Sequence, residues 1–322
     1  MKKQLIAAAV AGAFALPAMA QNTVISGSIQ MGVIDSGAPG AKAIVRHFGG
    51  GLNALNINTT EDLGGGMTGG ASFQIRYLAT GQLGNASQSV TTQTTTPTFH
   101  NANVFLGSKE LGTLRVGKIA EDGNCAFDPW GCGGGAGSIA GFHGSTTISG
   151  NNGLIFASSM DSSVRYESPR WNGLNVNYHT TLQAAPAGQV ERTLANLTYT
   201  EGNIFAQYIQ GETFGKTKES GAGVRYNFGF MTASLNTAVT KTLGGAKTRD
   251  MTMLSASVPL RPGLTGLFGY SKDNSRAANA DTKWGLGVDY ALSKRTVVGA
   301  DVFEQEAASG STGYVVRLRH AY

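Results

Sequence analysis

The sequence predicts an all-β protein, a transmembrane antiparallel β-barrel. Apolar and polar side chains alternate with a period of two, in segments about as long as the 9–11 residues of a tilted membrane strand, to the end of the chain. Beyond residue 20, no apolar run is long enough for a membrane helix. The chain has 46 glycines and only 14% charged residues, unlike a soluble α/β enzyme built on leucine-rich helices.

The first twenty residues have the pattern of an export signal. A lysine pair opens the chain and precedes a short apolar core, Leu5 to Leu16, and Ala18 to Ala20 supply the small residues of a cleavage site. A membrane-spanning helix needs about 20 apolar residues, so the core is too short for an anchor. We expect a cleavable signal peptide over residues 1–20 and a barrel over residues 21–322.

The segment Lys283 to Leu292 shows the alternation most clearly. Its apolar face consists of Trp284, Leu286, Val288, Tyr290 and Leu292. Such a face points inward in a soluble sandwich, but it faces lipid in a membrane barrel whose polar face lines water. The export signal, the segment lengths and aromatic residues near strand ends favour the barrel. Because every backbone polar group in lipid must be paired, the sheet must close.

Sixteen segments have this alternation. They lie near residues 23–35, 52–60, 67–80, 99–108, 113–119, 161–168, 173–182, 191–200, 204–211, 220–227, 230–240, 250–258, 264–271, 283–292, 296–303 and 313–322. The connectors are short and long in turn, as expected for short periplasmic turns and longer external loops, and an even count puts both termini on the periplasmic side. Lys218 falls in a connector that we expect to be external.

No set of residues suggests catalysis. The five histidines are scattered, without Ser/His/Asp order or metal-ligand spacing, so we expect neither an enzyme nor a metal or other cofactor. The net charge of +5 is small and dispersed, which argues against a nucleic-acid partner. Cys125 and Cys132 lie close together in an exported chain, which favours a disulfide; two free thiols are the alternative.

Short motifs run through the chain from end to end. They include Gly32-Val33-Ile34-Asp35, Glu61-Asp62-Leu63-Gly64, Leu111-Gly112-Thr113-Leu114, Val164-Arg165-Tyr166-Glu167, Ala291-Leu292-Ser293-Lys294-Arg295-Thr296 and Leu318-Arg319-His320-Ala321-Tyr322. In these motifs the chain resembles the general porins of Gram-negative bacteria, most closely the betaproteobacterial type. The resemblance implies a homotrimer of sixteen-stranded barrels in the outer membrane, with an external loop folded inward as a constriction. It also implies passive diffusion of small hydrophilic solutes and ions; a substrate-specific channel or an adhesin barrel is the alternative.

Strand parity assigns a set of charged side chains to the polar face, which would line the pore. The predicted pore-lining residues are Arg76, Arg115, Arg165, Arg225, Lys283, Arg317, Arg319, Glu167 and Asp289. An excess of basic groups in a narrow channel favours anions, because the low-dielectric wall focuses the field. We therefore expect a modest anion preference; the alternative is that these charges pair with acids of the loops and only solvate the lumen.

The longest connector, roughly residues 120 to 160, is the predicted constriction loop. We expect its aperture to be shaped by Glu121, Asp122, Asp128 and Trp130, with the cysteine bridge as a stiffener. An external flexible loop is the alternative.

The resemblance also implies an assembly signal at the C-terminus, where Leu318, His320 and Tyr322 share one face. The expected partners are the barrel-assembly machinery, outer-membrane lipid and lipopolysaccharide. Further copies of the chain would be latched by the segment Thr91 to Thr98.

Overall fold

A computed structural model describes most of the chain. The described residues are 22–35, 37, 39–40, 42–47, 53–76, 98–121, 123–131, 159–182, 191–275, 282–304 and 312–322. The predicted signal peptide, Asp122, Cys132 and most of the predicted latch lie outside them. No helix in the described ranges is long and apolar enough to cross a membrane.

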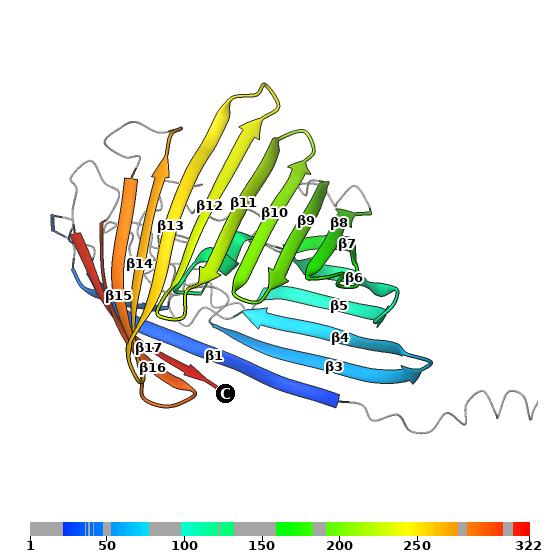
Figure 1. Cartoon of the computed structure of the whole chain (residues 1–322), viewed down its shortest axis with the longest axis horizontal. Helices are drawn as coiled ribbons and strands as arrows, with labels where there is room; N and C mark the ends of the chain where they lie inside the picture. Colours follow the sequence, from blue (N-terminus) through cyan, green and yellow to red (C-terminus); the bar gives the residue numbers. More distant parts are fainter. Residues whose placement is uncertain are drawn as a thin grey trace, which may run out of the picture.

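The chain forms one antiparallel sheet that closes on itself (Figure 1). Its elements in chain order are β1 (Asn22–Asp35), β2 (Ile44–His47), β3 (Ala54–Gly64), β4 (Met67–Arg76), β5 (Thr98–Ser108), β6 (Gly112–Ala120), the 3-10 helix η2 (Asn124–Phe127), β7 (Ser159–Glu167), β8 (Leu174–Thr181), β9 (Arg192–Glu201), β10 (Ile204–Thr213), β11 (Thr217–Asn227), β12 (Thr232–Thr242), β13 (Lys247–Arg261), β14 (Leu264–Asp273), β15 (Thr282–Ala291), β16 (Thr296–Glu304) and β17 (Thr312–Ala321). From β3 to β17 each strand pairs with the next, and β1 joins β3 to β17. The predicted antiparallel barrel of sixteen strands is confirmed, with β2 as an additional short piece.

The short strand β2 differs from the sequence prediction, which assigned residues 44–47 to a connector. One half of β1 pairs with β2, through Ile34 and Ile44, and the other half pairs with β3, through Ser28 and Ala54. The two pieces therefore share one place in the sheet. Four residues are too few for an alternation of apolar and polar side chains to mark a strand.

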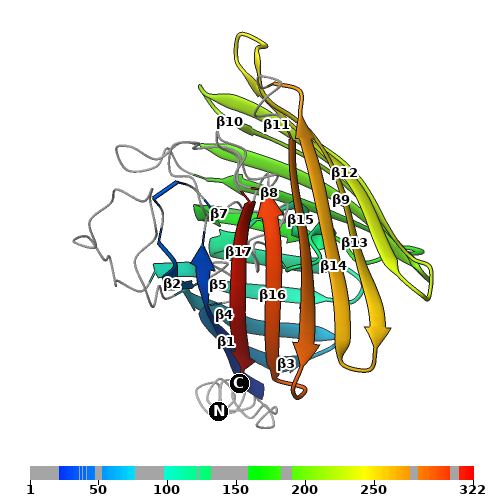
Figure 2. The same cartoon turned by 90° about the vertical axis from the view of Figure 1, so that its left-hand side faces the viewer.

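The first and the last strand of the barrel meet near the two chain termini, at the same rim. Gly27 and Tyr322 exchange two backbone hydrogen bonds of 3.2 and 3.0 Å, which places the C-terminus beside β1 (Figure 2). The connectors at this rim include the short turns 65–66, 109–111, 202–203, 228–231, 262–263 and 292–295. Since short turns are periplasmic in outer-membrane barrels, the opposite rim is external.

Two connectors at the external rim are shorter than the sequence predicts. The hairpins β10–β11 and β12–β13 turn within residues 214–216 and 243–246, so their strands extend further toward the external side. Lys218 therefore lies in β11 opposite Glu212, and its assignment to an external loop was wrong. Both faces of a strand are polar beyond the lipid, so the apolar alternation ends before the hydrogen-bonded ladder does.

The two faces of the sheet differ in polarity. Exposed apolar side chains cover the outside, as in Val104, Leu286 and Val316, whose exposed fractions are 48–60%. The inward residues are mostly polar, but Leu194, Ile209, Ala238, Met251 and Met253 form a buried apolar cluster on the inner face. The inner face is therefore not polar throughout. Along β9 to β13 the buried side chains of this face need no polarity, because water does not reach them.

Candidate functional site: the inward segment and the lumen wall

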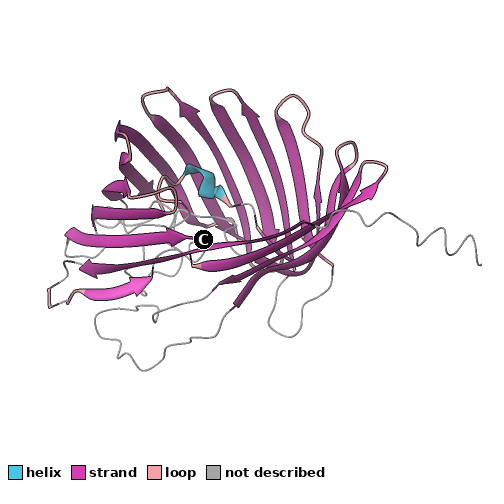
Figure 3. Ribbon diagram, turned by 90° about the horizontal axis from the view of Figure 1, so that it is seen from below, coloured by secondary structure: helices cyan, strands magenta, loops and turns pink. Residues whose placement is uncertain are grey.

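The chain turns into the barrel directly after β6. We call Glu121 and residues 123–131 the inner segment; its helix η2 lies within the ring of strands (Figure 3). The inner segment contacts side chains of β9, β11, β13 and β16. So short a segment can reach strands this far apart in the sheet only across the interior of the barrel. The side chains that it contacts therefore define the inner face.

Trp130 anchors the far end of the inner segment. Its indole Nε1 donates a 2.9 Å hydrogen bond to Oδ1 of Asp301 on β16. Asp301 is fully buried and also accepts hydrogen bonds of 2.9 and 3.1 Å from Arg317, which donates a third, of 2.6 Å, to Asp289. A buried carboxylate is costly unless it is paired and hydrogen-bonded, and three donors meet this one. At Gly299 a Cβ would lie 2.5 Å from the guanidinium carbon of Arg317, so only glycine leaves room for the network.

Phe127 anchors the middle of the inner segment. Its carbonyl oxygen accepts a 2.6 Å hydrogen bond from the hydroxyl of Ser255 on β13. Its ring packs against Phe205, with 5.6 Å between the ring centroids, and is almost fully buried. A Cβ at Gly223 on β11 would lie 2.5 Å from the same ring. Because Gly223 has no side chain, it leaves the space that the ring of Phe127 fills.

Two acids of the predicted constriction loop, Glu121 and Asp128, are described, and both have partners within the protein. Glu121 is buried and forms an ion pair of 2.5 Å with Arg192 on β9. Asp128 is also buried, and its Oδ1 accepts the backbone N–H of Trp130 at 3.1 Å. These carboxylates therefore position the inner segment and do not face the lumen as free charges.

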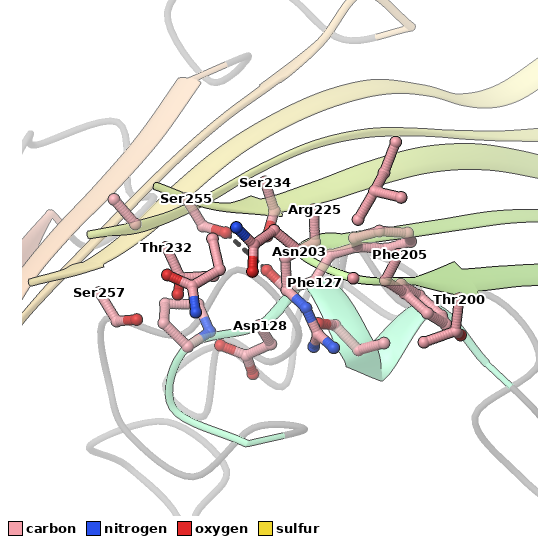
Figure 4. A pocket seen from close by; sticks show the side chains of 16 residues that line it. Phe127, Asp128, Thr200, Asn203, Phe205, Arg225, Thr232, Ser234, Ser255 and Ser257 are labelled. Carbon is pink, nitrogen blue, oxygen red and sulfur yellow. Dashed lines mark hydrogen bonds between the residues drawn. The ribbon is translucent and has the colours of Figure 1, made fainter. Parts of the chain in front are cut away.

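Open space adjoins the inner segment at two places. A cavity of about 490 Å³ lies beside its contacts with the wall of β9 to β13, and a second of about 410 Å³ lies next to Glu121, Arg115 and Arg165. Figure 4 shows the first cavity, where Phe127 meets the wall residues Arg225 and Ser255. The guanidinium of Arg225 donates a 2.6 Å hydrogen bond to a carbonyl of η2 and lies 5.0 Å above an aromatic ring. Hydroxyl and amide side chains, among them Asn203, Thr232 and Ser234, line this cavity together with the apolar Pro129, Ile204 and Ala256.

The structure places all nine predicted pore-lining residues on the inner face. Residues directly opposite each other in an antiparallel ladder share a face, and Arg225 is opposite Ser234, which is opposite Ser255. The same reasoning, followed around the ring, places Arg76, Arg115, Arg165, Lys283, Arg317, Arg319, Glu167 and Asp289 on this face.

Many of the inward charges are paired, as the alternative interpretation of the sequence proposed, although with acids of the wall more than of the loops. Arg115 and Arg165 contact one oxygen of Glu167 at 2.8 and 3.0 Å, so two guanidinium groups share one carboxylate. Within the described residues, no carboxylate pairs with Arg76 or Arg225. The wall from β4 to β7 therefore has an excess of positive charge.

Sequence reasoning missed part of this site. Arg192 and Ser255 were not among the predicted residues, although strand parity would have put both on the polar face. Nothing in the sequence indicates that they contact the inner segment. Cys125 lies in η2 and its expected partner lies outside the described residues, so the disulfide stays a prediction.

The predicted assembly residues project outward from β17. Leu318 is 51% exposed, and His320 lies 2.9 Å from the hydroxyl of Thr296. The hydroxyl of Tyr322 would lie 2.6 Å from a Cβ at Gly27, so the terminal ring covers that glycine.

A closed sheet with an apolar outside, a charged inside and a polypeptide segment across its lumen defines a membrane channel of the β-barrel class. A model of the Gram-negative porin family matches residues 7–307, and the chain belongs to this family. It is therefore a multi-pass β-barrel of the bacterial outer membrane.

Solved porin structures agree with this fold. The chain is 20% identical to an anion-selective porin from Comamonas acidovorans, with a TM-score of 0.68, over 94% of this chain and 100% of that one. A triple mutant of the Rhodopseudomonas blastica porin is 16% identical, with a TM-score of 0.66 and the same coverage. A loop-deletion mutant of OmpT from Vibrio cholerae is 12% identical, also with a TM-score of 0.66 and the same coverage. No curated protein matches the chain.

Proposed function

We propose that small hydrophilic solutes and ions diffuse through the lumen of this outer-membrane channel, and that the inner segment sets its narrowest cross-section. The supporting observation is the anchoring of the inner segment to β9, β11, β13 and β16, with open cavities beside it at two places. A segment fixed at several points gives a constant aperture. Solutes pass without chemical change, so this function needs no catalytic group and no cofactor.

We further propose a modest preference for anions. It is supported by the two arginines that share Glu167 and by Arg76, which has no carboxylate partner among the described residues. Positive charge along one wall lowers the energy of an anion in the narrow part of the pore and raises that of a cation.

Liposome swelling with sugars of increasing size tests the proposed function. A diffusion channel gives rates that fall smoothly with solute size. Rates that saturate with one solute would instead establish a substrate-specific channel, and the absence of swelling with every sugar would favour an adhesin barrel.

We propose that the first twenty residues are removed on export and that the barrels assemble as homotrimers, since porins of this family are generally trimeric. The mass of the purified protein in mild detergent tests whether the barrels form a homotrimer. A monomeric mass would contradict the trimer.

Replacing Tyr322 by Ser should leave unfolded chain in the periplasm. The terminal residue closes the ring against Gly27, and we propose that its outward aromatic ring is read by the barrel-assembly machinery. The measurement is the amount of heat-modifiable barrel in outer-membrane fractions. The conservative variant Tyr322→Phe should assemble normally, and normal assembly of Tyr322→Ser would contradict the role.

The bond between Cys125 and Cys132 should be present in the exported protein. Denatured, unreduced protein should then react with no thiol reagent, and peptide mapping should find one bridge within the inward loop. Two alkylated cysteines would show that the loop is held by its anchors alone.

A further inference from the structure

The cavity beside Phe127 lies on the periplasmic side of the inner segment (Figure 4). Its lining includes Gly202 and Asn203 of one periplasmic turn and Thr232, which directly follows another. We call this space of about 490 Å³ the periplasmic cavity. Since cavities of about 300–1,000 Å³ hold small ligands, it has room for a small solute.

Arg225 is the basic residue among the described residues that line the periplasmic cavity. Its guanidinium has five N–H groups, and one of them donates a 2.6 Å hydrogen bond to the carbonyl oxygen of Ala126. The guanidinium carbon also lies 5.0 Å from the centroid of the Phe205 ring, which orients the plane of the group. The remaining donors form a planar fork that matches the two oxygens of a carboxylate.

Asp128 limits the charge that a bound solute can carry. It is the acidic residue among the described lining residues, and it is buried. Its Oδ1 accepts the backbone N–H of Trp130 at 3.1 Å, whereas most donors of Arg225 have no partner in the described part of the chain. Like charges a few Å apart repel strongly at reduced dielectric. The cavity therefore compensates one negative charge of a solute, but not two.

A group of polar side chains in the lining has no hydrogen-bond partner among the described residues. They belong to Thr200, Asn203, Thr232, Ser234 and Ser257. Ser234 is only 6% exposed, and a buried hydroxyl group is normally hydrogen-bonded. The hydroxyl groups of a solute would supply the missing partners, since a hydroxyl group both donates and accepts.

The second cavity, next to Arg115, differs in this respect. Several of its hydroxyl and amide groups are bonded within the wall. Ser72 donates to Asn58 at 2.7 Å, and Asn101 accepts a backbone N–H at 2.7 Å. The capacity to bind the hydroxyl groups of a solute is therefore greater in the periplasmic cavity.

We propose that the periplasmic cavity is a subsite for a hydroxylated monocarboxylate, a sugar acid, on its way through the channel. The carboxylate binds Arg225, the hydroxyl groups bond to the threonine, serine and asparagine side chains, and the carbon chain lies against the apolar lining. This inference rests on the proposed function, because the solute reaches the cavity through the lumen. A weak subsite slows such a solute and leaves the diffusion of others unaffected.

Single-channel recording in potassium chloride with added gluconate tests the proposal. Binding in the cavity interrupts the chloride current, and the current noise gives the dwell time of the solute. We expect a dwell time about tenfold longer for gluconate than for glucose, which lacks the charge, or acetate, which lacks the hydroxyl groups. Glucarate, which has two negative charges, should also dwell for a shorter time than gluconate.

Arg225→Gln should shorten the gluconate dwell time about tenfold and leave that of glucose unchanged. Because Arg225 also holds the inner segment, the double variant Asn203→Ala, Thr232→Val is needed, and it leaves every anchor of that segment in place. It should shorten the dwell time of gluconate but not that of acetate. The matched control is Thr60→Val, on the inner face of β3, half of the ring away from β11, and it should keep the wild-type dwell times.

Equal dwell times of gluconate and glucose in the wild-type protein would overturn the proposal, as would a gluconate dwell time that neither variant changes. Acetate or glucarate dwelling as long as gluconate would overturn the assignment to a sugar acid. A shortening in Thr60→Val as large as in the double variant would place the binding elsewhere in the lumen. The chloride conductance in the same traces separates the two proposals: a conducting channel without gluconate interruptions refutes the subsite alone, whereas the absence of conductance refutes the channel function and the subsite with it.

Discussion

Replacing Asp301 by Ala should widen and destabilise the aperture of the channel. The change removes the acceptor of the Trp130 indole, which is the anchor of the inner segment on β16. A hydrogen bond to a charged group contributes about 1.5–3 kcal/mol, and each ~1.4 kcal/mol is a factor of ten in an equilibrium. The population with a released segment should therefore rise by about tenfold or more.

Single-channel recording in planar bilayers measures this effect as a higher mean conductance and larger open-state fluctuations. Liposome swelling should show faster entry of large sugars. Arg317 keeps Asp289 as a partner in this variant, so the barrel should still fold, which heat-modifiability on gels verifies.

Trp130→Phe is the complementary change, because it removes the donor and leaves Asp301 with Arg317. It should reproduce the conductance change, and the double variant should add little to either single one, since both remove the same contact. The matched control is Trp171→Phe, because Trp171 is exposed near the periplasmic rim, away from the inner segment. Unchanged conductance in Asp301→Ala and Trp130→Phe together would show that this anchor does not set the aperture.

Replacing Arg76 by Glu should move the ion selectivity toward cations. Arg76 projects inward from the external end of β4, and its Nε donates only to Gln74, at 2.9 Å. At an effective dielectric constant of about 20, two charges about 4 Å apart interact by about 4 kcal/mol, and the water of an open pore screens most of this. We expect the permeability ratio to change a few-fold, measured as the reversal potential in a salt gradient.

Arg115→Gln should shift the reversal potential in the same direction by a smaller amount. It leaves Arg165 and Glu167 as a neutral pair and so removes one positive charge, whereas Arg76→Glu changes the charge by two. Lys294→Glu, in a periplasmic turn, is the control and should have little effect because salt screens it. A shift in this control as large as that of Arg76→Glu would contradict the assignment of selectivity to the inner wall.

The sequence by itself determined the barrel fold and the number of strands. It also determined which side chains of each strand face the lumen and which face the lipid. This is possible because lipid and water impose opposite polarity on alternate residues, and a period of two survives small errors in strand boundaries. Prediction from the sequence failed where alternate residues do not face lipid on one side and water on the other. The short strand β2, the strand ends at the external hairpins, and the inward Met251 and Met253 lie where both faces meet water or neither does.

Only the tertiary structure decided which inward charges remain unpaired and what holds the inner segment. Trp130 and Asp301 are 171 positions apart, and no local pattern links them. Glu121 and Asp128 could be placed in the constriction loop from sequence, but their burial against Arg192 and the backbone of Trp130 could not. Strand parity gives the face of a residue, whereas its partner depends on the closure of the ring and the path of the chain through it.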